Sequence, residues 1–111
     1  RVLVLCEGPF DALKVDLYGR DRGIRACAIL TTAVTPEKAA RIARLSDRFD
    51  ALSIGLDRAA QRQSWALRDA LAPLRPRCAY LPKGYEDPGE LDAVGGRAFA
   101  RAVLTACGLP G

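Results

Sequence analysis

The sequence predicts an α/β fold in which a four-stranded parallel sheet carries helices on both faces. Short apolar runs recur along the chain, stretches with helical spacing of apolar residues lie between them, and turns containing Gly or Pro separate the two. Strands that alternate with helices are joined by right-handed crossovers, which make the strands parallel. The predicted strands span residues 2–6, 24–30, 51–56 and 78–81.

The first strand and helix are predicted from an apolar run and a proline. Residues 2–6 are all apolar, as expected for a strand buried in the core. A helix over about residues 9–18 follows, and Pro9 occupies a first-turn position where its missing N–H is tolerated. A turn at 19–23 then leads into the second strand.

The remaining helices are predicted from caps and apolar stripes. Thr35 is the expected cap of a helix that begins at Pro36. A third helix over about residues 60–74 follows the third strand, and a last helix spans about residues 96–107. The expected inner faces consist of Ala39, Ile42, Ala43 and Ser46; Leu67, Ala70, Leu71 and Leu74; and Phe99, Ala102, Val103 and Ala106.

The length of 111 residues corresponds to one domain, residues 1–111. Half of the residues are apolar, but charges interrupt every apolar run well before it could span a membrane. We therefore expect a cytoplasmic protein without a membrane partner. Because the chain begins without methionine and enters a strand at once, we expect a domain cut from a longer protein.

The charge and cysteine content favour some functions and exclude others. All but three of the 17 cationic residues are arginine, and the net charge of +4 makes nucleic acid a reasonable partner. The same composition also suits solvated helix faces. The four cysteines form no Cys-x-x-Cys pair, and the absence of histidine excludes a Cys/His zinc site and histidine-based catalysis. We expect all four to be buried free thiols in a reducing compartment.

Acidic residues follow the predicted strands. Glu7 directly follows the first strand, Asp11 lies one helical turn later, Asp57 follows the third strand, and Asp87 lies in a loop rich in Pro and Gly. The carboxyl ends of parallel strands share one edge of a sheet, so these acids can converge. Carboxylates without histidine suit a hard cation, and the sequence therefore predicts a Mg²⁺ or Mn²⁺ site.

Three segments together resemble a known family. They are Glu7-Gly8-Pro9-Phe10-Asp11, the strand that ends in Asp57, and the 81–91 segment Leu-Pro-Lys-Gly-Tyr-Glu-Asp-Pro-Gly-Glu-Leu. They resemble the Toprim domain of topoisomerases and primases, and most closely that of bacterial and phage DnaG-type primases, with motifs E-G-x-x-D and L-P-x-G-x-D-P-x-E-L. The resemblance covers nearly the whole chain.

One motif departs from the family pattern. The family carries D-x-D after the third strand, whereas this chain has Asp57-Arg58-Ala59. In one register Ala59 replaces the second aspartate, and in the other Gly55 replaces the first. Either way one carboxylate is missing, which we expect to weaken binding of a divalent cation.

The resemblance implies the catalytic core of a primase, a DNA-directed RNA polymerase that makes RNA primers during DNA replication. Asp57 and Asp87 would hold Mg²⁺, and Glu7 would be a metal ligand or general base. Asp11 would tune the metal site, and Lys83 would neutralise a phosphate or remain a solvated loop lysine. The implied partners are a single-stranded DNA template, nucleoside triphosphates and a replicative helicase.

Two alternatives remain open. A Toprim nuclease would use the same metal site to hydrolyse phosphodiester bonds. A non-catalytic Toprim module would bind nucleic acid or a helicase, as the missing aspartate suggests. We also expect the isolated domain to be inactive, because primases need a template-gripping segment and usually a zinc-binding domain.

Overall fold

A computed structural model describes residues 1–30, 34–55 and 61–110, excluding the side chains of 61–64. The described strands form one parallel sheet in the order β2-β1-β3-β4. This arrangement confirms the α/β fold expected from the sequence. The strands are β1 (Val2–Cys6), β2 (Ile24–Ala28), β3 (Ala51–Ile54) and β4 (Arg77–Cys78).

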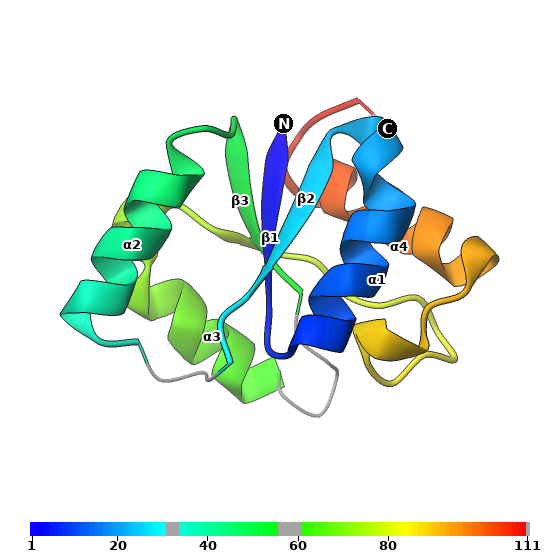
Figure 1. The fold of residues 1–111 in the computed structure, drawn as a ribbon, viewed down its shortest axis with the longest axis horizontal. Helices are drawn as coiled ribbons and strands as arrows, with labels where there is room; N and C mark the ends of the chain where they lie inside the picture. Colours follow the sequence, from blue (N-terminus) through cyan, green and yellow to red (C-terminus); the bar gives the residue numbers. More distant parts are fainter. Residues whose placement is uncertain (31–33, 56–60, 111) are drawn as a thin grey trace.

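Four α-helices cover the two faces of the sheet (Figure 1). Two of them, α1 and α4, pack on one face, and α2 and α3 pack on the other. The helices are α1 (Pro9–Gly19), α2 (Pro36–Ser46), α3 (Gln61–Ala70) and α4 (Ala93–Ala106). The described residues also form short 3₁₀ segments at η1 (Arg20–Arg22), η3 (Ala72–Leu74) and η4 (Pro88–Glu90).

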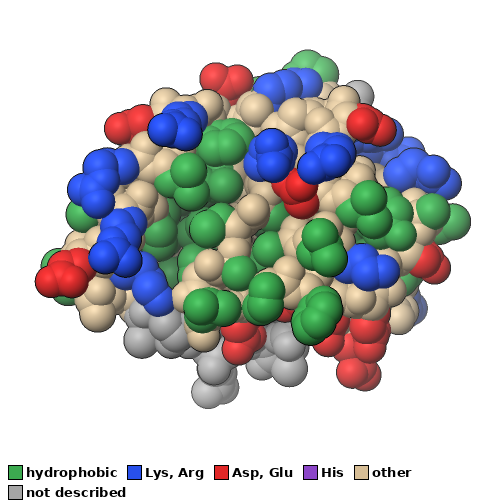
Figure 2. All heavy atoms as spheres, in the orientation of Figure 1, with side chains coloured by type: hydrophobic (Ala, Val, Ile, Leu, Met, Phe, Trp, Pro, Cys, Tyr) green, Lys and Arg blue, Asp and Glu red, His purple; other side chains and the backbone are tan. Residues whose placement is uncertain are grey.

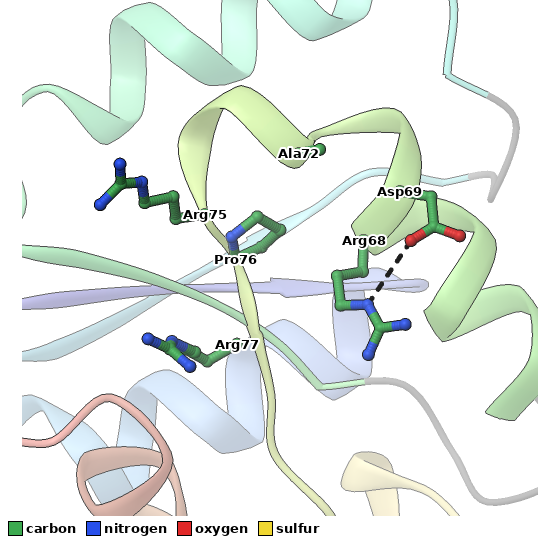
Figure 3. Close-up of a pocket in the computed structure, with 6 residues that line it drawn as sticks. All are labelled: Arg68, Asp69, Ala72, Arg75, Pro76 and Arg77. Carbon is green, nitrogen blue, oxygen red and sulfur yellow. Dashed lines mark ion pairs between the residues drawn. The ribbon is translucent and has the colours of Figure 1, made fainter.

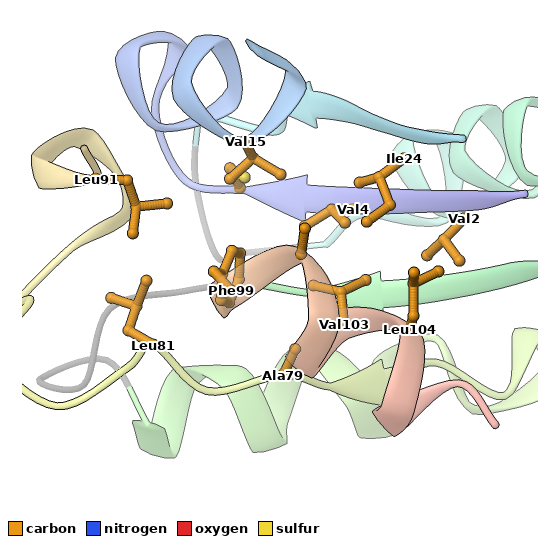
Figure 4. Packing of buried hydrophobic residues seen from close by; sticks show 12 residues of the cluster. Val2, Val4, Val15, Ile24, Ala79, Leu81, Leu91, Phe99, Val103 and Leu104 are labelled. Atoms are coloured by element: carbon orange, nitrogen blue, oxygen red, sulfur yellow. The ribbon is translucent and has the colours of Figure 1, made fainter. Parts of the chain in front are cut away.

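The core has two layers because successive residues of a strand point to opposite faces. From β1, Val2, Val4 and Cys6 pack toward α1 and α4, where Phe99 and Val103 meet them (Figure 4). The other layer of fully or nearly buried side chains consists of Leu3, Leu5, Ile29, Ile42, Leu52, Ile54, Leu67 and Leu71.

Several element boundaries differ from the sequence predictions. The second strand ends at Ala28 instead of residue 30, and the chain turns at Leu30, which has a φ of 64°. The fourth strand is Arg77–Cys78, shorter than 78–81 and one residue earlier. The third helix ends at Ala70, because Pro73 has no N–H with which to continue α-helical hydrogen bonding.

The last helix begins three residues earlier than expected. Asp92 caps it by accepting a hydrogen bond from Gly95 N–H at 2.8 Å, and α4 therefore begins at Ala93 instead of Gly96. Thr35, in contrast, caps α2 as predicted, accepting from Lys38 N–H at 3.1 Å.

All four cysteines are free thiols, but only Cys6 is fully buried. Burial raises the pKa of the Cys6 thiol above its usual range, and the nearby charges of Asp11 and Cys27 add to the effect. Cys6 therefore stays protonated and behaves as an apolar core residue. No helix within the described residues is long and apolar enough to cross a lipid bilayer.

Asp16 lies in α1, and its side chain contacts the edge strand β2. Its carboxylate accepts a hydrogen bond from Arg25 Nε at 2.6 Å, one from Arg20 at 3.1 Å, and one from Ala26 N–H at 3.4 Å. An edge strand exposes backbone groups that can pair with other chains. The charge pairs at Asp16 partly cover this edge.

We expect Asp16→Asn to lower the free energy of unfolding by less than about 1 kcal/mol at pH 7, because the ion pairs are largely at the surface. Burial opposes ionisation of Asp16, but the Arg25 contact, the Ala26 N–H and Arg20 outweigh it and lower the pKa below 3.8. The native form thus binds its proton less readily than the unfolded form. The stabilisation is complete above the unfolded pKa and disappears as the pH falls through the folded pKa.

Urea unfolding of the parent and the Asp16→Asn variant from pH 7 to pH 2.5 tests this expectation. The matched control is Asp21→Asn, which removes an exposed charge with no ion pair among the described residues. A difference between parent and Asp16→Asn that does not shrink at low pH would contradict the electrostatic explanation.

Close contact between α1 and α4 depends on a glycine. A Cβ built on Gly96 would lie 2.3 Å from Cγ of Tyr18, and Gly96 is buried inside α4. A glycine within a helix normally costs about 1 kcal/mol relative to alanine. At this position the missing side chain makes room for the Tyr18 ring.

We expect Gly96→Ala to destabilise the fold by about 1–2 kcal/mol, because overpacking of Tyr18 outweighs the gain in helix propensity. The measurement is the midpoint of urea unfolding. In a Tyr18→Ala background the same substitution should cost less or become stabilising. Equal costs in both backgrounds would show that the Tyr18 contact is not the cause.

Candidate functional site

The candidate site lies at the edge where the strands of the sheet have their carboxyl ends. Glu7 follows β1 directly, Asp11 lies in the first turn of α1, and Asp87 immediately precedes η4. In Figure 1 this edge is at the bottom, where η4 lies beside the start of α1. Figure 2 shows acidic side chains along the same lower edge.

Asp11 and Asp87 meet at Gly89. Gly89 N–H donates to Asp11 Oδ1 at 2.9 Å, joining residues 78 positions apart. A Cβ built on Gly89 would lie 3.0 Å from Oδ1 of Asp11 and 3.0 Å from Oδ1 of Asp87. The two carboxylate oxygens are therefore separated by at most twice that distance. Two carboxylates this close attract a cation.

The backbone around Glu7 is held by β1 and the segment after β2. Ile29 N–H donates to Cys6 O and Leu30 N–H donates to Glu7 O, both at 2.8 Å. Leu30 adopts a left-handed φ of 64°, which is uncommon for a leucine, and strained residues of this kind cluster at functional sites. The side chain of Glu7 is exposed and can reach a ligand at this edge.

The loop that carries Asp87 is held at its base by Tyr85 and Asp92. Tyr85 Oη donates to Asp92 Oδ1 at 2.7 Å, and this hydrogen bond raises the pKa of Tyr85. The hydrogen bond from Gly95 N–H lowers the pKa of Asp92, and the hydrogen bond from Tyr85 lowers it further. A Cβ on Gly95 would lie 2.3 Å from the Tyr85 ring, so glycine is needed there. This clamp fixes the loop against the start of α4.

The predicted site residues have different outcomes. Asp11 and Asp87 are brought together, and Glu7 lies at the same edge. Asp57 lies outside the described residues, so its proposed role stays a prediction. Lys83 is exposed in its loop. Within residues 1–30, 34–55 and 61–110, the structure has no group of three or more His, Cys, Asp or Glu side chains arranged to hold a metal ion.

Sequence reasoning missed Gly89, Leu30 and Tyr85 as parts of the site. Gly89 follows Pro88 within the 81–91 motif, and a glycine at this position indicates that another group can approach the backbone closely. No local signal identifies Leu30 or Tyr85, because their roles depend on contacts with Glu7 and Asp92.

Neither a protein-family model nor a curated protein matches the chain. Among solved structures, it is similar to the Aquifex aeolicus primase (zinc-binding and RNA polymerase domains), with a TM-score of 0.70 and 26% identity over 95% of this chain. A small TOPRIM domain protein from Bacillus stearothermophilus gives a TM-score of 0.63 and 16% identity, covering 96% of this chain and 90% of that one.

The chain has the Toprim fold. Its structural relatives include a primase, as the sequence motifs predicted. The Toprim chain spans only 26% of the Aquifex primase chain, so the activity of a whole primase does not transfer to it directly.

We expect Asp11→Ala to lower the free energy of unfolding of this Toprim domain by about 1.5 kcal/mol, because Gly89 N–H loses a charged acceptor in a partly buried position. Asp11→Asn should cost less than half as much, since the amide oxygen can still accept that hydrogen bond. The measurement is urea unfolding in a chelating buffer. Equal losses in the two variants would show that charge, and not the hydrogen bond, stabilises the Gly89 loop.

Proposed function

We propose that this chain is the Toprim catalytic core of a primase-like protein, which makes RNA primers on single-stranded DNA by Mg²⁺-dependent nucleotidyl transfer. The observation that carries the proposal is the convergence of Asp11 and Asp87 on Gly89, at the edge where Glu7 follows β1. The likeness to the Aquifex primase over 95% of the chain supports it.

The chemistry of the donor set fits a hard divalent cation. Glu7, Asp11 and Asp87 offer carboxylate oxygens, and the chain contains no histidine that would favour zinc. Asp57, which follows β3 in the sequence, would add a further carboxylate. Bound Mg²⁺ or Mn²⁺ would neutralise the phosphate charge that builds up during nucleotidyl transfer.

The residues of the chain would have separate roles in this reaction. Glu7 would accept the proton of the attacking 3′-hydroxyl or bind the metal, because its side chain is exposed at the end of β1. Asp87 and Asp57 would be metal ligands. Asp11 would hold the 81–91 loop in place through Gly89 N–H, and Lys83 would offset charge on a nucleotide phosphate.

A specific observation favours a second candidate function. The segment Asp57-Arg58-Ala59 lacks one carboxylate of the D-x-D motif, which suits a non-catalytic module that binds nucleic acid or a replicative helicase. In that case binding to DNA persists in a chelator and survives loss of Glu7, and the longer protein incorporates no ribonucleotides. The nuclease alternative instead requires cleavage of a nucleic acid without nucleoside triphosphates.

We expect Mg²⁺ and Mn²⁺ to bind the parent chain saturably, and Asp57→Asn and Asp87→Asn to weaken that binding about tenfold or more, because each removes a charged ligand. The measurement is isothermal titration calorimetry. The matched control is Asp47→Asn, an exposed acid at the end of α2 that removes the same charge away from the site.

Saturable binding that depends on Asp57 and Asp87 but not on Asp47 would support the metal site. The next test is template-dependent incorporation of ribonucleotides by the longer protein, with Glu7→Gln as the inactive variant. An absence of metal binding to the parent would sink the catalytic proposal and leave the non-catalytic module.

A further inference from the structure

A pocket rich in arginine lies beside the edge strand β4 and shares no residue with the acidic edge. It has a volume of about 290 Å³ and is formed by the end of α3, by η3 and by the start of β4 (Figure 3). It is lined by Arg68, Asp69, Ala72, Arg75, Pro76 and Arg77.

Among the described residues that line this pocket, guanidinium groups outnumber carboxylates. Asp69 is the only carboxylate among these described lining residues, and it pairs with its sequence neighbour Arg68 at 3.7 Å, both side chains being exposed to solvent. Within the described part of the chain, Arg75 and Arg77 form no ion pair. Guanidinium groups bind phosphate through paired hydrogen bonds, so both side chains are suited to an anionic ligand.

The backbone holds Arg75 and Arg77 on a short, constrained segment. Arg75 adopts a left-handed φ of 53° at the end of η3, a position that usually favours glycine, and its N–H donates to Ala72 O at 2.9 Å. Pro76, which is buried, fixes the backbone between the two arginines. Strained residues other than glycine cluster at binding and active sites, which is consistent with a ligand at this segment.

The arginines spread around the pocket instead of meeting at one point. In Figure 3, Arg75 and Arg77 extend to the same side of Pro76, whereas Arg68 reaches in from α3 on the other side. A single phosphate would be held by groups that converge. Groups that spread along an edge fit successive phosphates of a polymer.

We propose that this pocket binds the sugar–phosphate backbone of a single-stranded nucleic acid through Arg75 and Arg77, with Arg68 at its rim. The choice of a nucleic acid as the polyanion rests on the proposed function. The pocket itself acts without a metal and independently of sequence, because guanidinium–phosphate contacts do not involve base edges.

The test is fluorescence anisotropy of a labelled oligo(dT) strand titrated with the 111-residue chain in EDTA, over a range of salt concentrations. We expect Arg75→Gln/Arg77→Gln to weaken binding about tenfold or more at low salt. The slope of log affinity against log salt should become shallower by about 1.4, or 0.7 for each lost phosphate contact.

A second pair of arginines provides the matched control. Arg44→Gln/Arg48→Gln removes the same charge from exposed positions in and just after α2, and should change affinity by no more than about twofold. Arg75→Gly should also weaken binding while leaving the urea midpoint unchanged or higher, because glycine tolerates the left-handed φ. That result would exclude unfolding as the cause.

Three outcomes would overturn the pocket proposal: no binding of oligo(dT) to the parent, equal losses in the two double variants, or full displacement of the strand by a nucleoside triphosphate. Oligo(dT) binding through Arg75 and Arg77 in a chain that does not bind Mg²⁺ would support the pocket and contradict the catalytic proposal. The two proposals can therefore fail separately.

Discussion

The burial of β1 on both faces is the constraint on which the rest of the structure depends. Each residue of Val2–Cys6 is at most 2% exposed. Removing a Val or Leu side chain from water contributes about 2 kcal/mol, so both faces of this strand must be covered. Helices α1 and α4 cover one face and α2 and α3 the other, while β2 and β3 satisfy its backbone groups. Because β1 is held on both faces, the position of Glu7 directly after its carboxyl end is fixed as well.

One hydrogen bond then joins the two ends of the candidate site. Asp11 is positioned by the first turn of α1, and Gly89 is positioned by the loop that follows β4. Gly89 N–H donates a hydrogen bond to Asp11 Oδ1 and so holds the two segments together. The close approach of the Asp11 and Asp87 carboxylates is unfavourable without a compensating charge. The loop keeps its position because the Tyr85–Asp92–Gly95 contacts hold its base against α4.

The distribution of charge explains how a chain with net charge +4 can carry an acidic site. Carboxylates gather at the carboxyl ends of the strands, whereas Arg75 and Arg77 flank a pocket at the β4 edge. Separate sites avoid direct neutralisation of the acids by arginine, which would reduce their affinity for a metal.

The sequence by itself determined the alternation of strands and helices, the buried character of β1, the Thr35 cap and the placement of acids after strands. Each of these follows from a local pattern, namely periodicity, a capping residue or a position at the end of an apolar run. Asp92 is also a residue type that caps helices, and this local signal favours a last helix that begins at Ala93 over one that begins at residue 96. Only the tertiary structure decided that Gly89 joins Asp11 to Asp87, that Gly96 makes room for Tyr18, and that Arg68 shares a pocket with Arg75 and Arg77. These contacts depend on how the elements pack in three dimensions, and a one-dimensional pattern does not contain that packing.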